Sequence, residues 1–125
     1  MVKTAISIVI AFCLILTVSY FELTFVSYTF TEFRGILEVL YLKTQSGLAS
    51  YEDGYAVLSF WEEKKNVLHI WLPHTSINSV ENELSEAMGY LRQENCEDAL
   101  PKIEILLSLT HSIPESYAVK LKNVF

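Results

Sequence analysis

Residues 60–77 read FWEEKKNVLHIWLPHTSI and contain the end of one predicted helix and the turn into the next. The ring of Pro73 pushes the residue before it out of the α region, so a helix that begins near Tyr51 is expected to end at Leu72. Apolar residues form two neighbouring stripes on this helix: Val57, Leu58, Phe60, Trp61, Val67, Leu68, Trp71 and Leu72. Two stripes need two neighbouring elements, so we expect this helix to lie between other helices.

The segments on either side of this helix also have helical features. Before it, residues 47–54 form a turn in which Ser50 is placed to cap the helix, with Glu52 and Asp53 where negative charge suits the helix dipole. After the short connector 73–76, one apolar stripe predicts a third helix: Ile77, Val80, Leu84, Ala87, Met88 and Leu91.

A fourth helix is predicted after a polar break. Asp98 is the favoured N-cap, because it makes Pro101 the third helical residue, where a missing N–H matters little. A cap at Asn95 would place Pro101 deeper and bend the helix. Pro114 is expected to end this helix. Residues 116–125 then form a tail that docks on the bundle through apolar side chains: Val119, Leu121, Val124 and Phe125.

The chain before the first turn is predicted to be one long helix that ends near Gly47. Apolar residues recur in it at a four-three-four-three spacing: Val26, Phe30, Phe33, Leu37 and Leu40. Residues 24–30 are rich in types that favour strands, which leaves a two-stranded alternative open.

An uncharged segment, residues 4–21, opens this long helix. TAISIVIAFCLILTVSYF would span about 27 Å as a helix, enough to cross a bilayer. Lys3 precedes it, whereas Glu22 and Glu32 follow it before the first cation, so we expect a single-pass protein with a cytoplasmic N-terminus. Residues 1–21 would be the anchor and 22–125 an extracytoplasmic helical domain. A cleaved signal peptide is the alternative, although the residues near position 19 fit a cleavage site poorly.

The composition separates the apolar segment from an acidic remainder. At 125 residues the chain has room for one domain with a modest core, and it combines 51% hydrophobic residues with a net charge of -6. All fifteen acidic residues and eight of the nine basic ones follow residue 21. Because no basic patch is present to neutralise phosphates, we expect no nucleic-acid partner.

Residues suited to catalysis or metal binding are scattered. His69 and His74 are five apart with a proline between them, which is not the spacing of a helical zinc pair. Cys13 lies in the apolar segment and Cys96 is the only other cysteine, so no internal disulfide is expected. No local Cys/His or Ser/His/Asp signature and no glycine-rich phosphate loop is present. We therefore expect no enzymatic activity, no cofactor and no metal.

The two tryptophans are expected to serve mainly the core. They lie ten residues apart, on neighbouring stripes of one helix and not in a single aromatic cage. Tryptophan is also enriched in interface hot spots. Trp61, Trp71 and His74 are therefore the candidate contacts for a protein partner.

Besides the apolar anchor, several short motifs follow one another in a characteristic order: Trp61-Glu62-Glu63-Lys64-Lys65, Val67-Leu68, His74 with Ile77, the helix 84–91, Asp98-Ala99-Leu100, Ile113-Pro114-Glu115 and Leu121-Lys122-Asn123-Val124. This order resembles the DUF4363 family of small membrane-anchored helical proteins of Firmicutes, for which no activity is established. The resemblance implies an all-helical, exported domain. The acidic residues that the family carries around its histidine are replaced here: Pro73, Thr75, Ser76 and Asn78.

These patterns predict an all-α protein in which a transmembrane helix continues into an external antiparallel bundle of three to four helices. Tetratricopeptide-like helical hairpins are an alternative arrangement. We expect a non-enzymatic protein-interaction module at the cell envelope, held by membrane lipid through residues 4–21. The alternative is an accessory sensor or regulator of a multi-span membrane protein. A small hydrolase would require a deep polar pocket lined by histidines: His69, His74 or His111.

Overall fold

The protein is all-α, as the sequence predicts. The computed structural model describes residues 1–124, except for the side chains of residues 121 and 124, and shows four helices with no strand in that part of the chain. They are α1 (Val2–Gln45), α2 (Tyr51–Trp71), α3 (His74–Arg92) and α4 (Cys96–Val124). The two-stranded alternative for residues 22–45 is therefore wrong. Residue 125 and the side chains of residues 121 and 124, three of the four expected tail contacts, lie outside this description.

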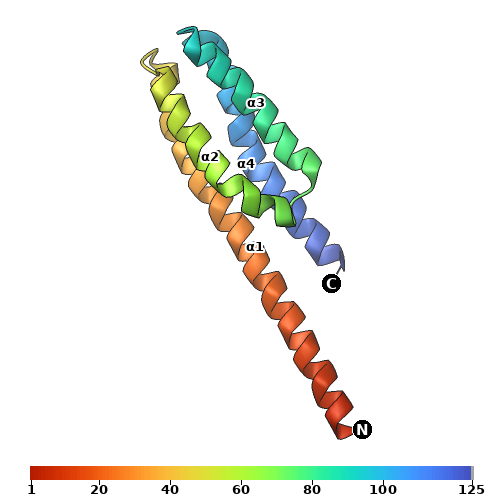
Figure 1. The fold of residues 1–125 in the computed structure, drawn as a ribbon. Helices are drawn as coiled ribbons and strands as arrows, with labels where there is room; N and C mark the ends of the chain where they lie inside the picture. The colour runs from red at the N-terminus through yellow and green to blue at the C-terminus, as the bar shows by residue number, and fades with distance from the viewer. Residues whose placement is uncertain (125) are drawn as a thin grey trace.

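The four helices form a closed antiparallel bundle from which the first part of α1 projects (Figure 1). Each helix packs on its neighbours in sequence, and α4 also packs along α1, which closes the ring. Within residues 1–124, no Cα atoms of α1 and α3, or of α2 and α4, come within 8 Å of each other, so these two pairs lie diagonally across the bundle. The closed ring favours a bundle over an open row of helical hairpins.

The second part of α1 supplies one wall of the core. Its buried residues follow the predicted stripe from Val26 onward: Val26, Thr29, Phe30, Phe33, Leu37, Leu40 and Thr44. No residue before Val26 is buried. Phe33 stacks on Phe60 of α2 with ring centroids 5.8 Å apart and lies 5.4 Å from the ring of Trp61. These aromatic contacts join α1 to α2.

The inward face of α3 matches the predicted spacing closely, and that of α2 matches it in part. All six residues of the predicted α3 stripe are buried. On α2, Val57, Trp61 and Leu68 are buried, whereas the side chain of Val67 remains 41% exposed. Five apolar residues of α4 complete the core: Ala99, Ile103, Leu106, Ile113 and Tyr117. A single apolar core thus runs the length of the bundle.

The two ends of α2 form as predicted. Gly47 adopts a φ of 73°, a left-handed conformation that glycine reaches without strain. Ser50 caps α2: its side chain accepts a hydrogen bond from the backbone N–H of Asp53, whose carboxylate accepts from the Ser50 N–H at 2.9 Å. This reciprocal capping box fixes the start of α2. Leu72 is extended before Pro73, so α2 ends where the sequence indicated.

The prediction that Asp98 caps α4 is wrong. The helix begins at Cys96 and Asn95 is its cap: Asn95 Oδ1 accepts from the Asp98 N–H at 3.1 Å, and Asn95 Nδ2 donates to the Asp98 carboxylate at 2.7 Å. Pro101 therefore lies deeper in the helix than expected. The carbonyl that its missing N–H leaves without a helical partner belongs to Glu97, which is exposed and can bond water.

The prediction that Pro114 ends α4 is also wrong, because the helix continues through it to Val124. A proline removes the hydrogen bond to the carbonyl four residues earlier, here that of Thr110, which is fully buried. Arg34 of α1 replaces it: Nη2 donates to the Thr110 carbonyl at 3.0 Å and Nε to the Thr110 hydroxyl at 3.2 Å. The buried carbonyl is thus satisfied from a neighbouring helix and α4 does not need to break.

Candidate functional site

The N-terminal apolar segment, residues 4–21, is the largest exposed apolar surface of the chain. Every residue in it is exposed except Ser19, which is half-buried. Among the described residues, α1 alone is long and apolar enough to cross a membrane, and none of its most apolar eighteen-residue window is buried in the protein. A core helix of similar composition would be covered by neighbouring elements. A membrane span or signal anchor would be covered by lipid instead.

The bundle has two ends that differ in chemistry. The segment-facing end consists of residues 66–78, around the α2–α3 turn, and residues 116–124 of α4. The distal end consists of residues 43–55 and 90–99, around the other two turns. Figure 1 shows that the C-terminal end of α4 and the α2–α3 turn lie on the side from which the apolar segment projects.

The α2–α3 turn combines apolar, aromatic and imidazole groups. The rings of His69 and His74 stack with centroids 5.6 Å apart and an interplanar angle of 29°. Between them, Ile70 is 69% exposed and Trp71 is half-buried against the core. His74 is the first residue of α3 and does not lie in a connector as expected. Two of the three predicted contact residues, Trp71 and His74, therefore occupy the segment-facing end.

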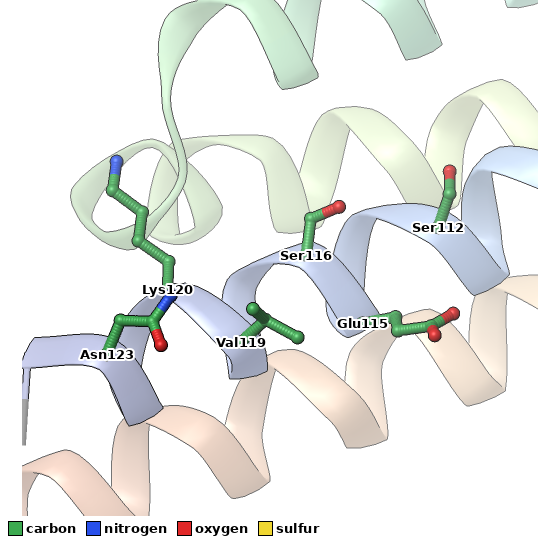
Figure 2. A pocket seen from close by; sticks show the side chains of 6 residues that line it. All are labelled: Ser112, Glu115, Ser116, Val119, Lys120 and Asn123. Atoms are coloured by element: carbon green, nitrogen blue, oxygen red, sulfur yellow. The ribbon is translucent and has the colours of Figure 1, made fainter.

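The last turns of α4 supply the positive charge of this end. A shallow hollow of about 440 Å³ lies over their outer face, lined by residues of α4 alone: Ser112, Glu115, Ser116, Val119, Lys120 and Asn123. Figure 2 shows the side chains of Ser116 and Lys120 pointing away from α1. Residues 66–78 and 116–124 together carry two lysines, Lys120 and Lys122, and no acidic residue.

The third predicted contact residue, Trp61, lies in the core and is 1% exposed, so a partner cannot touch its indole in this conformation. Its Nε1 is buried and forms no hydrogen bond of good geometry with any described residue. Lys65 lies 2.7 Å from the carboxylate of Glu81 on α3 and holds the pKa of Glu81 below its usual value, with a smaller contribution from the Trp61 indole. This part of α2 therefore serves to join α2 and α3.

The distal end is acidic. It carries five carboxylates but only two cations, Lys43 and Arg92. Arg92 lies over the ring of Tyr51, 4.9 Å from its centroid, and donates to its hydroxyl at 3.2 Å. Cys96 is half-buried and its thiol donates to the Ala49 carbonyl at 3.4 Å. Arg92 and the Cys96 thiol thus both help to close the turns of this end.

An apolar groove between α1 and α2 was not foreseen from the sequence. It has a volume of about 300 Å³ and is lined by both helices: Ile36, Val39, Leu40, Lys43, Glu52, Asp53, Ala56 and Val57. At its edge Val39 is 59% exposed and, one turn on, Leu42 is 61% exposed. Neither residue belongs to the buried stripe of α1. Apolar residues on the otherwise polar face of a helix were the signal that could have revealed this groove.

The described residues contain no group of three or more His, Cys, Asp or Glu side chains placed to hold a metal ion. Across the same part of the chain, no histidine forms a hydrogen bond with a serine, threonine or cysteine hydroxyl or thiol. The chemically distinctive features are instead an uncovered apolar helix, an apolar groove and two bundle ends of different charge.

Comparisons with known proteins define the family but assign no activity. No curated protein and no solved structure matches the chain. The sequence profile of the family described as "Domain of unknown function (DUF4363)" matches residues 41–124, which include the end of α1 and all of α2, α3 and α4. Because the match covers more than half of the sequence, the chain belongs to the DUF4363 family.

Proposed function

We propose that the protein is a single-pass membrane protein whose external bundle binds another protein at the cell envelope and has no catalytic activity of its own. The observation that carries the proposal is the exposed apolar segment at residues 4–21, joined without a break to a water-facing bundle. Lys3 before the segment and the acidic residues after it support a cytoplasmic N-terminus and an extracytoplasmic bundle.

The apolar groove between α1 and α2 is the surface that best fits a protein contact. Val39 in its lining and Leu42, one turn further along α1, are more than half exposed. Two charged residues of the lining are paired with each other, since Lys43 lies 2.9 Å from the carboxylate of Asp53. An apolar centre with a charged rim is typical of interaction sites. The α1 residues of the groove lie between positions 36 and 43, in the part of the helix away from the apolar segment, where a partner outside the membrane could reach them.

Site-specific photocrosslinking of the full chain in cells tests this proposal. A photoreactive residue at Val39 should give a discrete crosslinked product, and one at Ser108, on the exposed face of α4, should give none. The product should disappear when Leu42→Glu is added and should persist with the matched control Glu104→Lys. Equal labelling from both positions, or a product insensitive to Leu42→Glu, would contradict a specific contact at the groove.

Protease added to intact cells tests the topology. The portion after Phe21 should be digested from outside, because the bundle is proposed to be extracytoplasmic. Complete protection in intact cells, with digestion only after lysis, would contradict that orientation.

A second function is favoured by the continuity of α1, which runs as one helix from residue 2 to residue 45. Such a helix could couple the bundle to a multi-span membrane protein through the lipid-embedded segment, making the chain an accessory sensor or regulator. Replacing residues 4–21 by an unrelated apolar helix separates the two functions. Crosslinking at Val39 should survive the replacement if the bundle alone binds its partner, and should be lost if the segment makes the contact.

A further inference from the structure

We propose that the segment-facing end of the bundle binds the phosphate groups of anionic phospholipids through Lys120 and Lys122. This inference rests on the proposed membrane anchoring of α1 and adds to it a second, electrostatic contact with the same bilayer. The contact would hold the bundle upright against the membrane, with its acidic distal end directed away from the lipid.

The C-terminal end of α4 extends along α1 as far as the end of the apolar segment. The two helices run antiparallel, and a small hollow lined by both brings Ala118 close to Leu23. At 1.5 Å per residue, Lys120 lies about 3 Å and Lys122 about 6 Å beyond that level, toward the N-terminus of α1. Both lysines are thus level with the last turn of the apolar segment, near Phe21. When the segment spans the bilayer, this level is the edge of the hydrocarbon core, from which the long side chains of lysines can reach the lipid phosphates.

The charge of the segment-facing end is complementary to that of anionic lipids. The two stretches of the segment-facing end carry two lysines and no acidic residue, although the whole chain has a net charge of -6. The acidic group on α1 nearest to this level is Glu22, and burial raises its pKa. Both lysines are exposed and neither forms an ion pair with a described residue. Lysines near a membrane surface are attracted to anionic lipids.

The segment-facing end also exposes apolar and aromatic side chains. Ile70 and Val119 are 69% and 53% exposed. Trp71 has an apolar face toward the core, and its ring is only half-buried. Amphipathic aromatic rings are enriched at the membrane interface, where one end is apolar and the other is hydrated. Val119 lies on the turn of α4 that carries Lys120, and the α2–α3 turn lies on the same side of the bundle (Figure 1).

Tryptophan quenching in vesicles tests the contact with the full chain. The protein is reconstituted into phosphatidylcholine brominated near the headgroup, alone or mixed equally with phosphatidylglycerol. Trp71 should be quenched more strongly in the anionic vesicles, while Trp61, buried in the core, provides the unquenched background. A Trp71→Phe variant measures that background. High salt should remove the difference between the two lipids, because it screens exposed charges.

Charge reversal identifies the groups responsible. Lys120→Glu with Lys122→Glu should reduce the quenching of Trp71 in anionic vesicles to the level in neutral ones. The control adds negative charge at two exposed positions of the distal end instead, Gln45→Glu with Gln93→Glu, and should leave quenching unchanged. Equal loss in both double variants, or quenching that does not depend on lipid charge, would overturn the inference.

Flotation of the same vesicles distinguishes the absence of the electrostatic contact from the absence of membrane anchoring by α1. If every variant floats with both lipids but Trp71 does not respond to lipid charge, α1 is anchored and the electrostatic contact is absent. If the unmodified chain does not float with either lipid, the anchoring itself is contradicted, and the inference falls with it.

Discussion

The two parts of α1 share one unbroken helix but require different surroundings. In residues 4–21 apolar side chains surround the whole helix, and the structure leaves them uncovered. In residues 26–44 the buried residues form a single stripe against the bundle, and polar residues occupy most of the other faces. A helix that is apolar all round is stable only when buried in protein or lipid. The comparison teaches that two parts of one continuous helix need different surroundings to cover their apolar side chains.

Placing charges in the first part of α1 should have the largest effect. Ile10→Arg with Leu14→Arg puts two cations at the centre of the segment, where each opposes insertion by about 2.5–3.5 kcal/mol. The variant should move from the membrane fraction to the soluble or aggregated fraction on alkaline extraction. Glu38→Arg, on the second part of the helix, is the control and should remain in the membrane. Retention of the double variant would remove the distinction between the two parts.

Truncating the stripe of the second part should destabilise the bundle and leave membrane insertion intact. Phe33→Ala removes a ring that is 1% exposed and should lower the free energy of unfolding by about 3–5 kcal/mol. Tyr28→Ala, an aromatic truncation on the same helix at a residue that is 67% exposed, should change it by less than about 0.5 kcal/mol. Urea unfolding in detergent, followed by circular dichroism, provides both values. Similar losses would mean that this face of α1 is not the packed one.

The contact between Arg34 and α4 should have an intermediate effect and can be isolated by a double-mutant cycle. Arg34→Met leaves the buried Thr110 carbonyl without a donor and should cost about 1–3 kcal/mol of stability. In a Pro114→Ala background the backbone N–H of residue 114 becomes available to that carbonyl, so the cost of Arg34→Met should fall. Chemical unfolding of the four proteins provides the coupling energy. An unchanged cost would show that Arg34 does not compensate for the proline.

The smallest expected effect is a pH dependence at the distal end. The hydrogen bond from Lys43, followed by that from the Ser50 backbone, lowers the pKa of Asp53 below its ordinary value. The resulting stabilisation is present above the ordinary carboxyl pKa and is lost as pH falls through the lowered one. Both partners are solvent-accessible, so the contribution should be about 1 kcal/mol or less. Asp53→Asn should flatten the acid limb of the stability profile, and an identical limb in that variant would contradict this assignment.

Local signals in the sequence predicted much of the fold. Apolar spacing placed the stripes of α1 and α3, and Ser50 and Pro73 marked the boundaries of α2. The two errors in α4 have different physical causes. The Glu97 carbonyl that Pro101 leaves unbonded is in an exposed residue and can bond water, whereas the buried Thr110 carbonyl that Pro114 leaves unbonded is satisfied by Arg34. Arg34 and Thr110 are 76 residues apart in sequence, so no local pattern shows that one satisfies the carbonyl of the other.

The candidate site was less predictable than the fold. Trp61 and Trp71 look equivalent in sequence, but only the structure shows that α1 covers Trp61 while Trp71 lies at the segment-facing end. The apolar groove depends on how α2 lies against Val39 of α1, which is a tertiary property. The positive charge near the apolar segment likewise appears only when α4 is seen to run back along α1.

Modification of Cys13 is the most direct test of membrane insertion. Cys13 lies within the apolar segment and is uncovered by protein. A water-soluble maleimide is added to sealed membranes that contain the full chain, and modification is located by mass spectrometry, with Ser108→Cys as the exposed reference. Cys13 should remain unmodified until the membrane is dissolved in denaturing detergent, because lipid surrounds it. Modification of Cys13 as fast as that of the reference cysteine would contradict the membrane-spanning position of residues 4–21.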